Sequence, residues 1–165
     1  MFRQMRRPRQ QLPQSEVEAA LHAATSGVLA LLGDEDYPYA VPLSYVYADG
    51  KILFHCAKSG HKLDAVRNHN KVSFCVTAQD QVVPEKYTTY FRSVIVFGRI
   101  RELEGEEKRN ALRMLGRRYH PADTAENLNA TVEQHLTVTC VLELAAEHMT
   151  GKEAKELMQR RKVES

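Results

Sequence analysis

The chain has 165 residues, of which 43% are hydrophobic and 27% charged, so it fits a globular protein with one domain and a sizeable core. The formal net charge of +2 argues against nucleic acid or a membrane surface as a partner. No apolar run approaches the roughly 18 residues of a membrane span, and the N-terminus lacks the apolar segment of a secretory signal, so we expect a cytoplasmic protein.

The first residues form a basic arm. Residues 1–14 carry four arginines and no acidic residue. Such an arm either is solvated and packs loosely on its own domain, or contacts a phosphate group or a partner. We expect the domain itself to span residues 15–150 and a C-terminal helix or tail to follow at 151–165.

The next segment predicts a helix and then strands. Ser15 and Glu18 have the spacing of a capping box, which predicts a helix from about residue 15 to 25 that ends at Gly27. Strands are expected at residues 28–32, 37–47 and 51–55, with the last two joined as a hairpin by the turn at 48–50.

Pro42 lies in the middle of the second of these strands. Because proline has no backbone N–H group to donate to a ladder, it indicates an edge strand, a bulge or a bound group. Two interpretations stay open, namely a plain edge strand and a flat ligand lying against the backbone around Val41, Pro42 and Leu43.

Later segments alternate between helices and strands without a βαβ rhythm. Helices are expected at 58–68, 104–119, 131–136 and 152–162. Strands are expected at 72–77, 88–103 and 137–144, with a loop at 79–87 and a break at Thr150 and Gly151. These elements predict a mainly β protein with peripheral helices, in which six antiparallel strands curl into a small barrel.

The segment from Phe54 to Lys62 joins a strand to a helix and carries two histidines and two lysines. The first backbone N–H groups of a helix have no partner within the helix, so a strand end that becomes a helix start can hold an anion. Ser59 could cap the helix, and Gly60 would let a ligand approach the backbone. The alternative is a solvated corner whose charges face water.

Cysteines are few in this chain. Cys56, Cys75 and Cys140 are odd in number and contain no C-x-x-C pair, so we expect neither a disulfide framework nor a structural zinc site. Cys56 and Cys75 lie in strand-like runs, where a small buried thiol is the usual outcome. No other metal site is expected.

Four motifs in order resemble the FMN-binding split barrels related to pyridoxamine 5'-phosphate oxidase, and among these the Nim (5-nitroimidazole resistance) proteins. The motifs are YAVPLSY (39–45), GKILFHCA (50–57), GHK (60–62) and YFRSVIVFG (90–98). The basic start and the late segment 150–152 agree, so the resemblance covers about residues 5 to 155.

This resemblance implies a six-stranded antiparallel FMN-binding split β-barrel that forms a homodimer with FMN at the subunit interface. It implies an FMN-dependent oxidoreductase that reduces a small electron-poor compound, such as a nitroaromatic. Because the chain has no G-x-G-x-x-G motif, NAD(P)H would bind only transiently at the flavin as the reductant.

The resemblance also implies the site residues. The flavin ring would lie against Val41, Pro42, Leu43 and Ser44, and the phosphate would be held by Ala57, Lys58, Gly60, His61 and Lys62. His55 would contact the flavin or substrate as the catalytic residue. Arg92, Ser93 and Val94 would approach the flavin, from the partner subunit.

Several alternatives stay open. His55 could simply bond the barrel rim, and Arg92 could form a structural pair with Glu85 or another carboxylate. The protein could be a non-catalytic binder of flavin or haem, with His55 as an axial haem ligand. It could also be an interaction protein that uses the basic arm.

Overall fold

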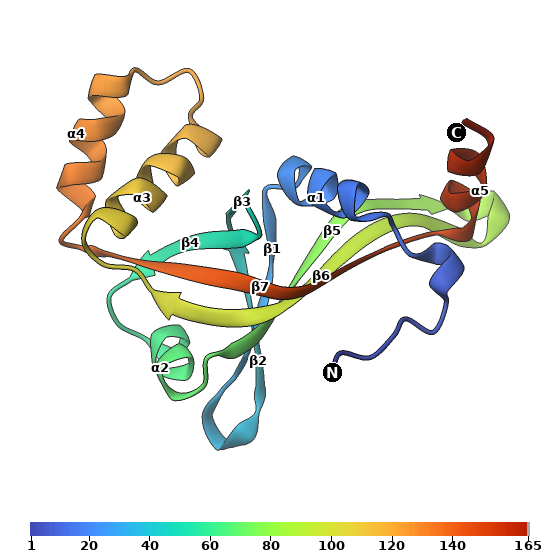
Figure 1. Cartoon of the computed structure of the whole chain (residues 1–165), viewed down its shortest axis with the longest axis horizontal. Helices are drawn as coiled ribbons and strands as arrows, with labels where there is room; N and C mark the ends of the chain where they lie inside the picture. The colour runs from blue at the N-terminus through green and yellow to red at the C-terminus, as the bar shows by residue number, and fades with distance from the viewer. Residues whose placement is uncertain (165) are drawn as a thin grey trace.

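The computed structural model of the chain describes residues 1–164. Its strands form one antiparallel sheet in the order β2-β1-β5-β6-β7-β4-β3 (Figure 1). The strands are β1 (Ser26–Leu32), β2 (Pro38–Ser44), β3 (Val46–Ala48), β4 (Lys51–Ala57), β5 (Lys71–Val83), β6 (Thr88–Glu102) and β7 (Thr139–Glu153). The α-helices are α1 (Gln14–Ala23), α2 (His61–Asn68), α3 (Gly105–Tyr119), α4 (Ala125–His135) and α5 (Lys155–Glu164). The mainly β fold is the one that the sequence predicts.

The chain itself brings the two edges of the sheet together. β2 and β3 lie at opposite ends of the strand order, yet only Tyr45 separates them in the sequence. The sheet therefore curls until its edges meet at Tyr45, which makes a split barrel. The sequence predicts one continuous strand here, which is why it predicts six strands where the structure has seven.

Tyr45 holds this seam closed. Its side chain is 1% exposed, and its hydroxyl donates a hydrogen bond of 2.7 Å to the carbonyl of Leu21 in α1. Its backbone N–H donates to the Tyr119 hydroxyl at 2.8 Å, at the end of α3. Burial raises the pKa of Tyr45 far above its ordinary value, so this phenol stays protonated and remains a donor.

Apolar side chains that alternate along the strands fill the barrel. Leu29, Phe74 and Leu142 are fully buried there, and α2 adds Leu63 to the same core. A second, smaller core lies under α3 and joins Leu53, Leu103, Ala111 and Val141. Since successive residues of a strand face opposite ways, the barrel interior is on one side of β4 and α3 is on the other.

The strands β5, β6 and β7 are much longer than the barrel needs. They extend to the right in Figure 1, away from α3 and α4, and end beside α5. The sequence predicts a loop at 79–87, but β5 continues to Val83 because Gln79, Asp80 and Gln81 pair with residues of β6. The ladder supplies the backbone hydrogen bonds, and the polar side chains face water on its outside.

Two other predicted ends are wrong. β7 continues through Thr150 and Gly151 to Glu153, because these residues pair with β6. Glycine is present at 151 because of close packing: a Cβ there would lie 2.8 Å from side-chain atoms of Leu12 and Val17. Helix α1 begins at Gln14 after Pro13, and no side chain caps it, so the predicted capping box does not form. Gly27 belongs to β1.

The basic arm packs on its own domain. Gln11 makes a bridge to Lys152 of β7, Leu12 is buried, and the Gln10 amide donates 3.1 Å to the Glu153 carbonyl. Further back, the Phe2 ring stacks on His148 at 4.7 Å. This matches the first interpretation of the arm. No helix within residues 1–164 is long and apolar enough to cross a membrane.

Candidate functional site

The turn between β4 and α2 forms an open helix start. Gly60 is the N-cap of α2, with φ of 120°, and no side chain caps the helix, so Ser59 does not act as the predicted cap. A Cβ built on Gly60 would meet nothing within 4 Å. The first N–H groups of α2 are therefore free of side-chain partners and face open space, as an anion site requires.

Positive charge gathers at this turn. Lys58 is exposed and Lys62 is half-buried, and both lie within two residues of Gly60. The His61 ring stacks on Tyr39 with centroids 4.1 Å apart, and its Nε2 lies 3.7 Å from an Asp34 carboxylate oxygen. Asp34 faces His61 and Asp64 lies in the first turn of α2, so Lys58 and Lys62 are the two cations that flank the open helix start. This donor set fits the phosphate end of FMN.

An apolar pocket of about 360 Å³ lies beside this turn, between the barrel and the α3–α4 hairpin. The barrel contributes Ser44, His55 and Thr139. The helices contribute an apolar wall and three polar side chains: Leu112, Leu115, Gly116, Leu128 and Val132, with Tyr119, Thr131 and His135. The pocket and the turn are connected along β4: Thr139 of the pocket pairs with Ala57, which is followed directly by Lys58.

His55 is exposed on the side of β4 that faces α3. It is therefore a pocket residue and not a barrel-core residue. His135 lines the same pocket from the last turn of α4. The pocket thus combines an apolar wall with imidazole and hydroxyl groups that can donate and accept hydrogen bonds, which is the usual make-up of a small-molecule site.

The predicted ring-lining segment lies on β2, at one edge of the sheet. Val41 and Leu43 pack on the barrel core, whereas Pro42 and Ser44 are exposed on the outer face. Pro42 faces Val28 in the ladder, and the edge position tolerates its missing N–H. The interpretation of Pro42 as an edge-strand residue is therefore confirmed, and a flavin lying against the backbone of β2 stays a prediction.

The predicted residues of β6 lie far from this region. The side chain of Val94 is fully buried in the main core, so only its backbone is left to approach a cofactor, and that approach stays a prediction. Arg92 forms ion pairs with Glu153 at 3.4 Å and Glu16 at 3.8 Å, so its structural partners are these carboxylates and not Glu85. Ser93 lies on the opposite face of β6 from Val94.

The ladder gives the separation of the two regions. His55 pairs with Val141 on β7, whereas Arg92 pairs with Glu153 on the same strand. Glu153 is twelve residues further along β7 than Val141, which is roughly 40 Å at about 3.3 Å per residue. Arg92 and Ser93 therefore do not reach the pocket of their own chain.

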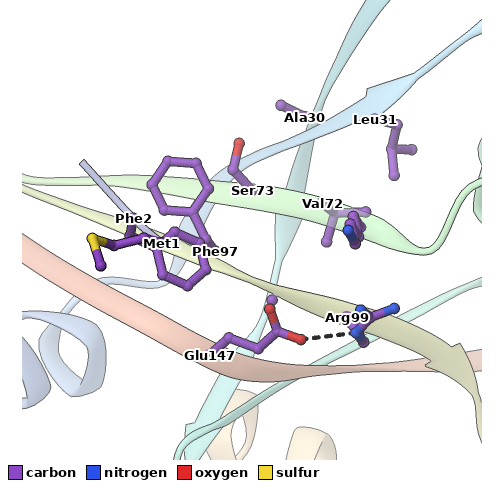
Figure 2. A pocket seen from close by; sticks show the side chains of 11 residues that line it. Met1, Phe2, Ala30, Leu31, Val72, Ser73, Phe97, Arg99 and Glu147 are labelled. Atoms are coloured by element: carbon purple, nitrogen blue, oxygen red, sulfur yellow. Dashed lines mark hydrogen bonds and ion pairs between the residues drawn. The ribbon is translucent and has the colours of Figure 1, made fainter.

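One face of the sheet is apolar and exposed. Val28, Cys75 and Ile95 form a single rung across β1, β5 and β6, and each is exposed. A hollow of about 550 Å³ lies on this face, and the ring centroids of Phe2 and Phe97 are 5.6 Å apart there. Figure 2 shows the side chains that line it. Pro42 lies on the same rung, opposite Val28. The predicted ring-lining strand therefore borders the apolar face.

The sequence was compared with those of known protein families. Residues 13–153 match the sequence profile of the family described as pyridoxamine 5'-phosphate oxidase. The chain belongs to the pyridoxamine 5'-phosphate oxidase family. No curated protein matches the chain.

Within residues 1–164, no three histidine, cysteine or carboxylate side chains converge as metal ligands.

Solved structures share the fold of this family member. A candidate 5-nitroimidazole antibiotic resistance protein from Bacteroides thetaiotaomicron is 22% identical, with a TM-score of 0.73, over 87% of this chain and 86% of that chain. A conserved hypothetical protein from Mycobacterium tuberculosis is 20% identical, with a TM-score of 0.75, over 88% of both chains. The FAD- and haem-binding protein from Mycobacterium smegmatis is 21% identical, with a TM-score of 0.71, over 88% of this chain and 74% of that chain. At these identities the likeness concerns the fold.

Sequence reasoning missed the helical side of the pocket. Tyr119 and His135 both lie in segments that the sequence predicts as helical, 104–119 and 131–136, but the resemblance assigned no role to either residue. A usable signal was present: Leu128, Val132 and His135 recur at helical spacing and therefore share one helix face.

Proposed function

We propose that this family member is an FMN-dependent oxidoreductase that reduces a small, flat, electron-poor compound, such as a nitroaromatic. One observation carries the proposal. The open, lysine-flanked start of α2 directly follows the strand that presents His55 to an apolar pocket. A phosphate site and a pocket for a small flat compound thus follow each other along β4 and the start of α2, as we expect where a bound flavin mononucleotide meets its substrate.

Each part of the site has its own task in this proposal. Lys58, Lys62 and the first N–H groups of α2 hold the phosphate, with Gly60 leaving room for it and His61 adding a donor. Ala57 belongs to the same phosphate segment, and the backbone from Val41 to Ser44 lines the ring. Bound FMN would supply the redox chemistry, with NAD(P)H as a transient electron donor.

The pocket under α3 and α4 would take the compound to be reduced. Its leucine and valine wall excludes water, and its volume of about 360 Å³ suits a small ring system. His55 would orient the compound through a hydrogen bond to an acceptor atom, and His135 would do the same from the opposite wall. We therefore propose both as substrate contacts.

The site is completed by a second copy of the chain. Arg92 and Ser93 lie roughly 40 Å along the strand from the pocket of their own chain, by the spacing of about 3.3 Å per residue. An exposed apolar face borders the ring-lining strand, which suits an interface between two copies. A homodimer would place Ser93 of one copy near the flavin of the other, and Arg92 near it as well.

A visible spectrum of the purified protein tests the cofactor. We expect flavin absorbance in about one-per-chain amounts, or its appearance after added FMN. Colourless protein that does not take up FMN would remove the proposal. Oxidation of NAD(P)H that depends on both the protein and a nitroaromatic acceptor would then test turnover.

The second candidate is a non-catalytic binder of flavin or haem with the same fold. Two histidines, His55 and His135, line one apolar pocket, which would also suit an axial haem ligand. The same spectrum separates the candidates, because haem gives an intense Soret band. Flavin absorbance without acceptor-dependent turnover would favour storage or sensing.

A further inference from the structure

Two of the three cysteines lie directly opposite each other in the barrel. Cys56 of β4 and Cys140 of β7 are register partners in an antiparallel ladder. Opposite residues in such a ladder have Cα atoms about 4.5 to 5.5 Å apart and side chains on the same face. That range falls inside the roughly 4.4 to 6.8 Å that a disulfide spans.

The two thiols already interact. Each acts on the titration of the other: Cys140 lowers the pKa of Cys56, and Cys56 raises the pKa of Cys140. The Cys140 thiol also lies 3.4 Å from a carboxylate oxygen of Glu102, which the Arg67 guanidinium holds at 2.7 Å. The register alone places the two side chains next to each other on one face of the sheet.

Access to the pair is one-sided. Cys56 is half-buried, whereas Cys140 is 6% exposed. The charge of Lys62 in α2 acts on Cys56 and favours its thiolate. An oxidant from solution therefore meets Cys56 first, and Cys140 lies behind it, in the position of a resolving thiol.

We propose that Cys56 and Cys140 are a redox-active dithiol, which a small disulfide-class oxidant such as oxidised glutathione converts into a cross-strand disulfide. The Cys56 thiolate attacks one sulfur of the oxidant, forms a mixed disulfide and releases one thiolate. Cys140 then loses its proton and attacks the Cys56 sulfur, which releases the second thiolate. The two cysteines lose two electrons and two protons, and the oxidant becomes two thiols.

The reaction has a defined pH dependence. Burial raises the pKa of Cys56, and Glu102 raises it further, whereas Lys62 and Arg67 lower it without cancelling the rise. Burial also raises the pKa of Cys140, to about 12. Both thiols thus rest protonated at neutral pH, so the rate of the first attack rises with pH, by about tenfold per unit below the pKa of Cys56.

Cys75 is the natural control. It is exposed on the outer face of β5, and three strand spacings of about 4.8 Å separate β5 from β4, so Cys75 cannot reach Cys56. A Cys75→Ser variant removes the exposed thiol and leaves the pair untouched. This variant is the protein for the experiment.

The experiment treats the Cys75→Ser protein with oxidised glutathione, blocks remaining thiols and maps peptides without reduction. We expect the loss of two hydrogen atoms, a link between the peptides of Cys56 and Cys140, and no retained glutathione. We expect the midpoint of thermal unfolding to rise, by roughly 5 to 15 °C. A protein whose two thiols stay free, or whose Cys56 keeps glutathione, would overturn the proposal.

Two further variants separate the attacking role of Cys56 from the resolving role of Cys140. When Cys140→Ser is added, Cys56 has no resolving partner and should retain one glutathione. When Cys56→Ser is added instead, the buried Cys140 should stay unmodified. Modification of Cys140 in that protein would contradict the assigned order of attack. Should either variant fail to fold, the peptide map of the Cys75→Ser protein still decides the proposal.

Discussion

Lys62 is the residue on which phosphate binding depends most directly. It is half-buried beside the open cap of α2, so a carboxylate in its place would face the phosphate. Charge-assisted hydrogen bonds contribute about 1.5 to 3 kcal/mol. We therefore expect Lys62→Glu to raise the Kd of FMN by at least about tenfold, measured by quenching of flavin fluorescence. The exposed Lys155→Glu should leave Kd unchanged, and an unaltered Kd in Lys62→Glu would place the phosphate elsewhere.

His55 should matter for the acceptor more than for the cofactor. It lines the pocket under α3 and α4, while the phosphate donors lie beyond Ala57. We expect His55→Ala to lower kcat/KM for a nitroaromatic by on the order of ten- to a hundredfold, with FMN still bound. His69→Ala changes an exposed histidine outside the pocket and serves as the control. Loss of FMN with no separate effect on kcat/KM would contradict this assignment.

At the residue scale, the sequence predicted where the charged side chains of the site lie, but not which of them pair with carboxylates. Lys58, Gly60 and Lys62 lie at the open helix start as expected. Arg92 was a cofactor candidate because of its motif, yet Glu153 and Glu16 pair with it. Those carboxylates lie far away in the sequence, so no local pattern could reveal them. Val94 is inward because β6 keeps a strict alternation that the motif comparison ignored.

Tyr119 ties the α3–α4 hairpin to the barrel seam. Its hydroxyl accepts from the Tyr45 N–H at 2.8 Å and lies 2.6 Å from the Thr25 carbonyl, to which it donates. Tyr119→Phe leaves the N–H of the buried Tyr45 unpaired, which costs about 1 to 3 kcal/mol. We expect that loss in the free energy of unfolding from urea titration. Tyr87→Phe, at an exposed site, should be neutral, and equal stability of both variants would contradict the clamp.

Helix α2 is attached to β6 by an ion pair whose effect depends on pH. The Arg67 guanidinium holds the pKa of Glu102 below its ordinary value of 4.5. A lowered pKa in the folded state stabilises the protein above the ordinary value, and the contribution disappears as pH falls through the folded pKa. We expect Glu102→Gln to unfold at lower urea than the parent at neutral pH, with the gap closing toward about pH 3. Glu85→Gln should show no gap, and a pH-independent gap for Glu102→Gln would contradict this account.

At the element scale, strands were predicted better than their ends. The hairpin of β3 and β4 and the long β6 are where periodicity placed them. The end of β5 was missed because polar residues continue a ladder once a partner strand is present. Helix α4 was predicted too short for a similar reason, since its few apolar residues stabilise a helix only when they pack against α3.

For the whole molecule, motif order predicted the family and the barrel, but could not show how the site is distributed. The closing of the sheet follows from the single residue between β2 and β3. The hydrophobic pattern predicted these two strands as one. The separation of His55 from Arg92 follows from the ladder register. In the function that we propose, one chain holds the phosphate turn and the pocket, and a second chain completes the site.

Sedimentation velocity with FMN, recorded at the flavin wavelength, tests this shared site most directly. We predict that flavin sediments with a dimer, at about one FMN per chain. Ile95→Lys places charge on the exposed apolar face and should give a monomer with little flavin, whereas Met114→Lys on α3 should behave as the parent. Flavin that sediments free, or with a monomer of the parent protein, would contradict the account.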